Sequence, residues 1–253
     1  MDIGVKPKLP WRVARVVDSE AETASAQTIG LTVPGWNGHL AGQHIDLKLT
    51  AEDGYSAQRS YSLSRPVDGE RIELTVQRIA DGEVSPYLVE VPAGDEIELR
   101  GPIGGWFVWR PDEEARVLLV GGGSGIVPLM AMLRQRVTAG NADFRLVYSV
   151  RSPADVFYAQ ELIRLERECG WLQVALAYTR TATPETARPP GRVGYRDLAP
   201  TGWTPDHGTR VYVCGPTGFV ESVTENLIEQ GHQPSAIRTE RFGPSNEPRN
   251  EES

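Results

Sequence analysis

One apolar stretch, residues 117–133, limits how this chain can fold more than any other segment. It approaches the length of a membrane-spanning helix, but four glycines between residues 121 and 125 and a proline at position 128 interrupt it. Apolar residues on both sides of a glycine-rich turn are typical of a buried strand followed by a helix. We therefore predict a strand, a tight turn and a helix here, and no membrane span.

The sequence pattern changes near residue 111. Before it, short segments in which apolar and polar residues alternate are separated by Gly, Pro and Asp, which predicts an antiparallel β-barrel or sandwich. After it, apolar strands alternate with helices, which predicts an open α/β sheet of parallel strands. We expect these strands at residues 117–120, 144–148, 174–178 and 211–214, and helices at 127–137, 159–169 and 220–230.

Two domains follow from this change of pattern. The first is expected to cover residues 1–110 and the second residues 111–244, with a linker at 111–114 and a polar tail at 245–253.

Composition argues against several classes of function. The formal charge is −8, from 34 acidic and 26 basic residues, whereas a nucleic-acid-binding protein needs a basic face. The first residues contain no apolar run of signal-peptide length, so we expect no export. Cys169 and Cys214 are too few for a disulfide framework or for the four thiolates of an iron–sulfur cluster. We expect a cytoplasmic monomer whose electrons, if it moves any, go to another molecule.

Residues 59–62 suit a flavin and its diphosphate. The Arg59 guanidinium presents a planar fork of donors, and Tyr61 is an aromatic that can stack on a flat ring. Ser60 and Ser62 lie two positions apart, so their hydroxyls face the same side of an extended strand. The alternative is a surface arginine followed by an ordinary barrel strand.

The turn at residues 81–86 offers another position for a phosphate. Gly82 and Ser85 precede a short helix expected at residues 87–90, and the start of a helix presents unpaired backbone donors. Ser85 could instead be a simple N-cap before Pro86 at the first helical position. The two interpretations are compatible.

The glycine-rich turn of the second domain suits the phosphate of a dinucleotide. Alternating glycines let a ligand approach the backbone closely, and a proline suits the first turn of the next helix. A glycine turn without a ligand is the alternative. The candidate contacts are Gly122, Gly123, Ser124, Gly125 and Pro128.

These motifs, together with residues 101–104 and 214–216, have the order and spacing seen in the ferredoxin-NADP reductase superfamily. The chain resembles that superfamily over roughly residues 11–244, and it is similar to the short reductase components that feed oxygenases without a fused ferredoxin. The resemblance implies that the turn at 82–85 holds the flavin diphosphate, and the additional phosphate implies FAD, because FMN has one. The implied flavin contacts beyond residues 59–62 are the backbone at Gln77, Arg78 and Ile79, and Gly82, Val84 and Ser85.

The resemblance also implies where nicotinamide meets flavin. Cys214, followed by Gly215 and Pro216, would lie beside the nicotinamide, and Glu240 and Phe242 match a carboxylate and an aromatic that approach the flavin. Ser62 would border the same contact. The alternative is a polar edge strand in which Phe242 merely caps the core of the domain.

Cys214 could also be interpreted as a nucleophile. A catalytic thiol needs a base and an orienting partner, and none of His39, His44, His207 and His232 stands in a recognisable context for one. We interpret His44, which falls in a strand, as structural.

The choice of nucleotide depends on arginines after the third strand of the second domain. Thr179, Arg180 and Arg192 match the positions where NADP-dependent relatives hold the 2′-phosphate, and no carboxylate follows the strand to favour a free ribose hydroxyl. This favours NADPH over NADH. Against it, an aromatic expected two residues past Arg192 is Gly194, and Tyr195 is one step out of register. Arg151 is a further candidate for the adenosine side.

The predicted function is FAD-dependent oxidation of NADPH or NADH, with single electrons passed to a separate ferredoxin, oxygenase-type partner or other terminal redox enzyme. A free flavin reductase and a flavin-bound regulatory subunit remain alternatives, because a fold alone does not determine function. The identity of the acceptor is not encoded in any motif.

Overall fold

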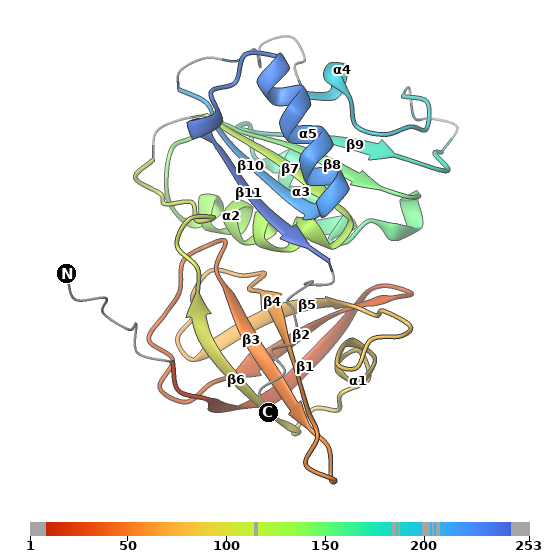
Figure 1. The fold of residues 1–253 in the computed structure, drawn as a ribbon. Coiled ribbons are helices and arrows are strands. Elements are labelled where there is room, and N and C mark those ends of the chain that lie inside the picture. The colour runs from red at the N-terminus through yellow and green to blue at the C-terminus, as the bar shows by residue number, and fades with distance from the viewer. Residues whose placement is uncertain are drawn as a thin grey trace, which may run out of the picture.

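The computed structural model of the protein describes residues 9–113, 116–183, 186, 188–198, 203, 205 and 208–243. It contains two domains, each built on one sheet, which lie one above the other in Figure 1. The predicted tail at 245–253, the linker residue Glu114 and His207 lie outside the described residues. None of the described helices combines the length and the apolar character that crossing a bilayer requires.

The first sheet is an antiparallel barrel, as the alternating pattern predicts. Its strands run in the order β4-β3-β6-β1-β2-β5, and a bridge between Leu63 and Leu74 joins its two edges. Alternate residues such as Ile45 and Leu47 are fully buried inside it. The elements are β1 (Arg12–Thr23), β2 (Ala26–Thr32), β3 (His44–Thr50), β4 (Ser56–Ser62), β5 (Arg71–Gln77), α1 (Ser85–Leu88) and β6 (Glu96–Ile103).

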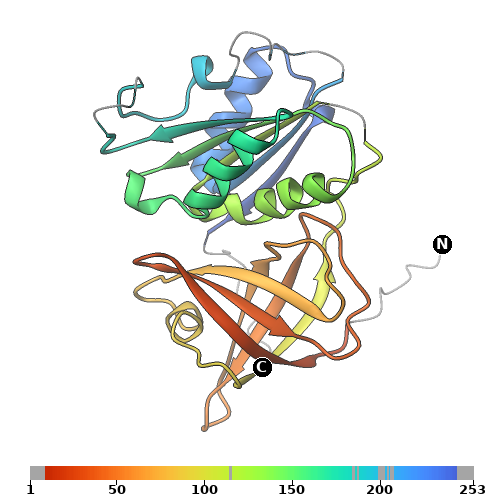
Figure 2. The ribbon, with the colours of Figure 1, turned by 180° about the vertical axis from the view of Figure 1, so that it is seen from behind.

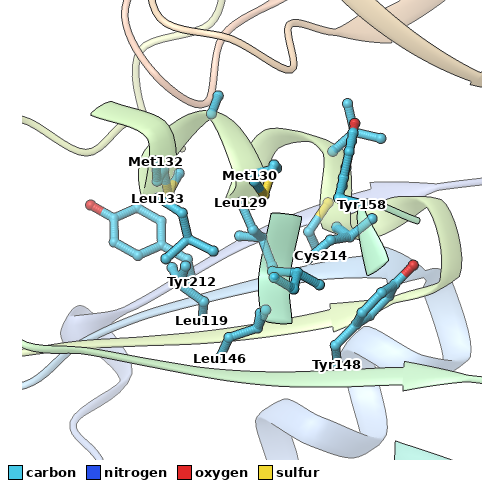
Figure 3. Close-up of a cluster of buried hydrophobic side chains, with 14 of the residues drawn as sticks. Leu119, Leu129, Met130, Met132, Leu133, Leu146, Tyr148, Tyr158, Tyr212 and Cys214 are labelled. Atoms are coloured by element: carbon cyan, nitrogen blue, oxygen red, sulfur yellow. The ribbon is translucent and has the colours of Figure 1, made fainter. Parts of the chain in front are cut away.

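The second sheet is parallel and lies between two layers of helices, so the predicted fold class is confirmed. Successive residues of β7 face opposite layers: Leu119 packs with α2 and α3, whereas Leu118 packs with α5. Figure 3 shows Leu129 and Leu133 of α2 lying over Leu119 on the first of these faces. The elements are β7 (Val117–Gly122), α2 (Ile126–Thr138), β8 (Phe144–Val150), α3 (Ala159–Glu168), β9 (Leu172–Tyr178), α4 (Tyr195–Leu198), β10 (Arg210–Pro216), α5 (Thr217–Glu229) and β11 (Ile237–Phe242), with 3₁₀ turns at Gly123–Gly125, Pro153–Asp155 and Pro234–Ala236.

The order of the second sheet identifies where a ligand can bind. The strands lie in the order β11-β10-β7-β8-β9, so the chain runs outward from β7 to β9 and then returns to the other side of β7. Neighbouring strands β7 and β10 are therefore followed by connections that leave in different directions. Open α/β sheets bind ligands beyond the carboxyl ends of such a pair.

A partly buried arginine of α2 joins the second domain to the barrel, on the side where α2 faces it (Figure 2). Arg134 donates hydrogen bonds to the carbonyl of Ser64 at 2.9 Å and to Oε1 of Glu73 at 2.5 Å, both in the barrel. It also binds both carboxylate oxygens of Glu161 in α3, at 2.7 and 3.1 Å. The ring of Tyr158 lies 5.0 Å from the guanidinium. One side chain thus connects elements of both domains.

Replacing Arg134 by Met should destabilise the protein by roughly 3 kcal/mol, because the buried Glu73 would lose its nearer cation and keep only Arg65, at 3.6 Å. Arg167→Met is the control, since the exposed Arg167–Glu168 pair should contribute less than about 1 kcal/mol. Urea unfolding measures both. Equal, small losses in the two variants would show that the junction does not depend on Arg134.

Candidate active site

The candidate active site lies where the barrel meets the carboxyl ends of β10 and β11. In the β3–β4 pair His44 is aligned with Ser62, and in the β10–β11 pair Cys214 is aligned with Glu240. The Nδ1 atom of His44 lies 3.6 Å from Oε1 of Glu240, so two strand pairs, one from each domain, meet through this contact. The structure thereby gathers three predicted site residues, Ser62, Cys214 and Glu240.

Two buried oxygen atoms of this site lack a hydrogen-bond partner within the described part of the chain. They are Oγ of Ser62 and Oε2 of Glu240. Buried polar atoms in folded proteins are nearly always paired. A ligand with polar atoms along its edge would supply the missing partners.

Burial determines which groups of the site are charged. It raises the pKa of the Glu240 carboxyl to about 7, so both of its forms are populated at neutral pH. Burial, and next the neighbouring Glu240, raise the pKa of the Cys214 thiol well above its ordinary value. Burial lowers the pKa of His44, and the opposing effect of the nearby Asp46 is smaller. The lowered pKa keeps the imidazole neutral at neutral pH. Cys214 remains a thiol at neutral pH, which argues against the nucleophile interpretation.

The glycine-rich turn packs tightly against the end of β10. A Cβ atom at Gly125 would lie 2.1 Å from the carbonyl oxygen of Cys214, so this close approach requires glycine. Gly123 has a φ of +55° and open space where a side chain would stand. Helix α2 begins directly after the turn, and Pro128 lies in its first turn. The positive end of this 13-residue helix suits a phosphate.

Phe242 stands at the end of β11, aligned with Pro216. Its half-buried ring packs against the apolar cluster on the α2 side of the sheet. Residues 214–216 are the segment predicted to lie beside the nicotinamide. Because Pro216 is aligned with Phe242, the ring of Phe242 stands next to this segment.

On the barrel side, the carboxylate of Glu83 pairs with Arg59, the residue predicted to bind the diphosphate. Arg59 donates to Oε2 of Glu83 and to the carbonyl of Gln58, each at 2.7 Å. The other carboxylate oxygen of Glu83 accepts a hydrogen bond from the hydroxyl of Tyr55 at 2.5 Å. The Arg59 side chain is 54% exposed. A diphosphate can therefore reach Arg59, but it must displace Glu83.

Ser60 and Tyr61, which follow Arg59 in β4, point to opposite faces of the sheet. Ser60 donates to the buried carboxylate of Asp46 at 2.6 Å, and Arg100 binds the same carboxylate. The hydroxyl proton of Ser60 is thus donated to Asp46 and is not available to a ligand. Tyr61 packs against the barrel core, and burial raises the pKa of its phenol to about 12.

The turn before α1 differs from the expectation in one detail. Val84 is the N-cap of this helix and Ser85 its first residue, so the interpretation of Ser85 as an N-cap is wrong. Its Oγ instead accepts the N–H of Ile79 at 3.0 Å, which leaves the hydroxyl proton free to donate. The N–H of Arg78 donates to Ser25 at 2.7 Å. A ligand running along residues 77–79 would therefore meet carbonyl groups and side chains there.

Backbone hydrogen bonds gather the residues predicted for the adenosine side. Thr179 and Arg180 donate their N–H groups to the carbonyls of residues 150 and 151, each at 2.9 Å. Gly191 donates to the carbonyl of Tyr178 at 2.9 Å, which brings Arg192 next to the end of β9. The side chains of Arg151, Arg180 and Arg192 are exposed.

Two residues lie at the candidate site without having been predicted from the sequence, His44 and Glu83. His44 was interpreted as structural, because nothing local relates it to Glu240 near the other end of the chain. Glu83 did carry a signal, since a carboxylate is out of place in a turn proposed to hold an anion. Its position beside Arg59 explains why it is there.

Comparison with known proteins identifies both halves. Residues 14–108 match the oxidoreductase FAD-binding domain, and residues 119–225 match the oxidoreductase NAD-binding domain. The chain is 28% identical over 248 residues to the flavohemoprotein of Vibrio cholerae, covering 92% of this chain and 60% of that protein. It is 32% identical over 208 residues to the glycine betaine monooxygenase reductase subunit of Chromohalobacter salexigens, covering 80% of this chain and 55% of that protein. The chain thus spans little more than half the length of these relatives.

The structure leads to the same class. The flavohem-like FAD/NAD-binding domain of the nitric oxide dioxygenase from Vibrio cholerae superposes on the chain with a TM-score of 0.82 and 27% identity, covering 92% of this chain and 99% of that one. The chain therefore belongs to the ferredoxin-NADP reductase superfamily, as its motifs predicted. Its first domain is of the type that binds FAD as a cofactor, and its second is of the type that binds a nicotinamide dinucleotide. The residues present fit FAD, because Ser62 and Glu240 hold unpaired buried oxygens at the domain contact and Arg59 is accessible on the barrel.

Replacing Glu240 by Gln should raise the free energy of unfolding, relative to the natural protein, increasingly between about pH 4.5 and 7. A carboxyl with a higher pKa in the folded state destabilises that state wherever it must ionise. The effect is absent below the ordinary value of 4.5, grows with pH and is constant above about 7. The shift corresponds to about 3 kcal/mol. Urea unfolding at pH 4.5, 6 and 8 measures it, and a difference independent of pH would contradict the raised pKa.

Proposed function

We propose that the protein oxidises NADPH, in preference to NADH, on its FAD and passes the electrons one at a time to a separate redox protein. The contact between His44 and Glu240 carries this proposal. It joins the end of a strand in the FAD-binding barrel to the end of a strand in the NAD-binding sheet. Each of these residues is aligned with a predicted site residue, Ser62 or Cys214, so the two nucleotide-binding domains converge on one point.

For FAD, we propose that Arg59, the hydroxyl of Ser85 and the turn at 82–85 bind the diphosphate. Tyr61 and Ser62 would lie along the ring system. For the nicotinamide dinucleotide, we propose the glycine-rich turn and the start of α2 as the diphosphate site, supported by the open space at Gly123. Arg151, Thr179, Arg180 and Arg192 would hold the adenosine end, and the three exposed arginines favour NADPH.

FAD, when bound, accepts a hydride from reduced nicotinamide and can release the two electrons singly. The protein supplies position and electrostatics. Buried Cys214 excludes water from the contact, and Phe242 covers it until nicotinamide enters. Glu240 holds a proton on its carboxyl below about pH 7 and releases it above that pH.

The proposed electron acceptor is an iron–sulfur protein or an oxygenase component. The two cysteines of this sequence cannot ligate a cluster of the four-thiolate type. The relative from Chromohalobacter salexigens is by name the reductase subunit of a monooxygenase. We also propose a cytoplasmic monomer, since both cysteines are free thiols.

One observation favours a second function, that of a free flavin reductase. The carboxylate of Glu83 competes with any diphosphate for Arg59, and such competition suits an enzyme that binds and releases flavin. The extent to which FAD copurifies with the protein distinguishes the two functions.

The first experiment is an anaerobic titration of the purified protein, followed by its visible spectrum. We expect a bound flavin that NADPH bleaches at lower concentration than NADH does, because the 2′-phosphate adds contacts to arginine. Oxidised ferredoxin added afterwards should restore the flavin band. A colourless protein that reduces added flavin would favour the free flavin reductase, and a yellow protein that neither nucleotide bleaches would overturn both functions.

Arg59→Ala should weaken FAD binding at least about 10-fold, because the diphosphate loses a charged pair of donors. Glu83→Gln should strengthen it by about 3-fold, because the competing carboxylate is removed while the shape of the side chain is kept. Quenching of flavin fluorescence on titration with protein measures both dissociation constants. Unchanged binding in Arg59→Ala would place the diphosphate elsewhere.

A further inference from the structure

An ion pair organises residues 188–194, directly before α4. Nε of Arg188 lies 2.6 Å from Oδ1 of Asp197, and a terminal nitrogen lies 3.0 Å from Oδ2, so the guanidinium grips the carboxylate with two parallel hydrogen bonds. Both side chains are largely buried, with exposed fractions of 26% and 18%. A pair in this geometry is fixed, unlike a pair of mobile side chains on an open surface.

The remaining donors of Arg188 bind the loop itself. They reach the carbonyl oxygens of Arg192 at 2.7 Å, Pro189 at 3.1 Å and Gly191 at 3.2 Å. Arg188 therefore holds the main chain on both sides of the peptide bond that links Gly191 to Arg192. A lysine could keep the charge but not this set of contacts, because it lacks the planar fork.

Asp197 binds the loop from the other side. Its Oδ2 accepts the N–H of Gly194 at 2.9 Å, at the start of α4. Burial alone would raise the pKa of this carboxyl, but the hydrogen bonds from Arg188 and Gly194 outweigh it and lower the pKa below its ordinary value. Asp197 is thus ionised at neutral pH, and the ion pair is permanent under those conditions.

The pair places Arg192 beside a second arginine. Gly191 is bonded to Tyr178 at the end of β9, where Arg180 stands two residues further on. Within the described residues, the side chains of Arg180 and Arg192 form no salt bridge, in contrast to the fully engaged Arg188. Two exposed guanidinium groups without a carboxylate partner are thus held near each other on an ordered backbone.

We propose that Arg188 and Asp197 are positioning residues that pre-form the loop bearing Arg192, and that they thereby determine the preference for NADPH over NADH. The proposal rests on the proposed function and deepens it. A phosphate binds more tightly to donors that are already in place, because no loop must be ordered on binding. NADH has no 2′-phosphate, so loss of the pair should weaken NADPH binding and leave NADH binding nearly unchanged.

Two probes isolate the 2′-phosphate: 2′,5′-ADP carries it and 5′-AMP does not. We would titrate the FAD-bound protein with each by calorimetry, using Arg188→Lys, Asp197→Asn and Arg192→Ala, with Arg167→Lys in the exposed part of α3 as the matched control. The first three variants should each weaken 2′,5′-ADP binding about 10-fold and 5′-AMP binding less than 2-fold, a loss comparable to that of one charge-assisted contact. The control should change neither.

Three outcomes would overturn the positioning role. Natural affinity for 2′,5′-ADP in Arg188→Lys would mean that charge alone matters at this position. Equal losses for both probes would indicate general damage to the domain, and thermal unfolding of each variant checks this independently. Equal binding of the two probes by the natural protein would end the proposal. That result would also remove the proposed preference for NADPH, but oxidation of a nicotinamide dinucleotide on FAD would survive it if NADH still bleached the flavin, and would fail only if neither nucleotide did.

Discussion

The partly buried guanidinium of Arg134 fixes how the two halves of this protein meet. A charge in an apolar setting is stable only when its hydrogen-bond donors are satisfied, and here the acceptors come from the barrel and from α3. Tyr158, which adopts a left-handed φ of 57°, completes the junction by donating its hydroxyl to Thr75 of the barrel at 2.5 Å. The contact between His44 and Glu240 depends on the orientation that this network imposes.

Most of the fold could be predicted because its signals are local. Alternation of apolar and polar residues predicts the barrel strands, and a glycine-rich turn between apolar runs predicts the strand β7 and the helix α2. Phosphate sites at turns share this property, since the glycines that permit a close approach are neighbours in sequence. The positions of Gly123 and Gly125 in the structure therefore agree with what their spacing suggests.

Contacts between distant segments could not be predicted in the same way. No local pattern relates His44 to Glu240, and the ion pair of Arg188 with Asp197 spans a loop whose path the sequence does not reveal. The competition for Arg59 cannot be seen in the sequence either, because its pairing with Glu83 forms only when strand β4 and the turn before α1 are brought together.

Strand β11 lies at the edge of its sheet and carries both Glu240 and Phe242. During synthesis it leaves the ribosome after the barrel and after the four other strands of its own sheet. Most of both domains can therefore fold before these two side chains emerge. A nascent chain that has not yet reached β11 would therefore possess both folded halves without the carboxylate and the ring that stand at their contact.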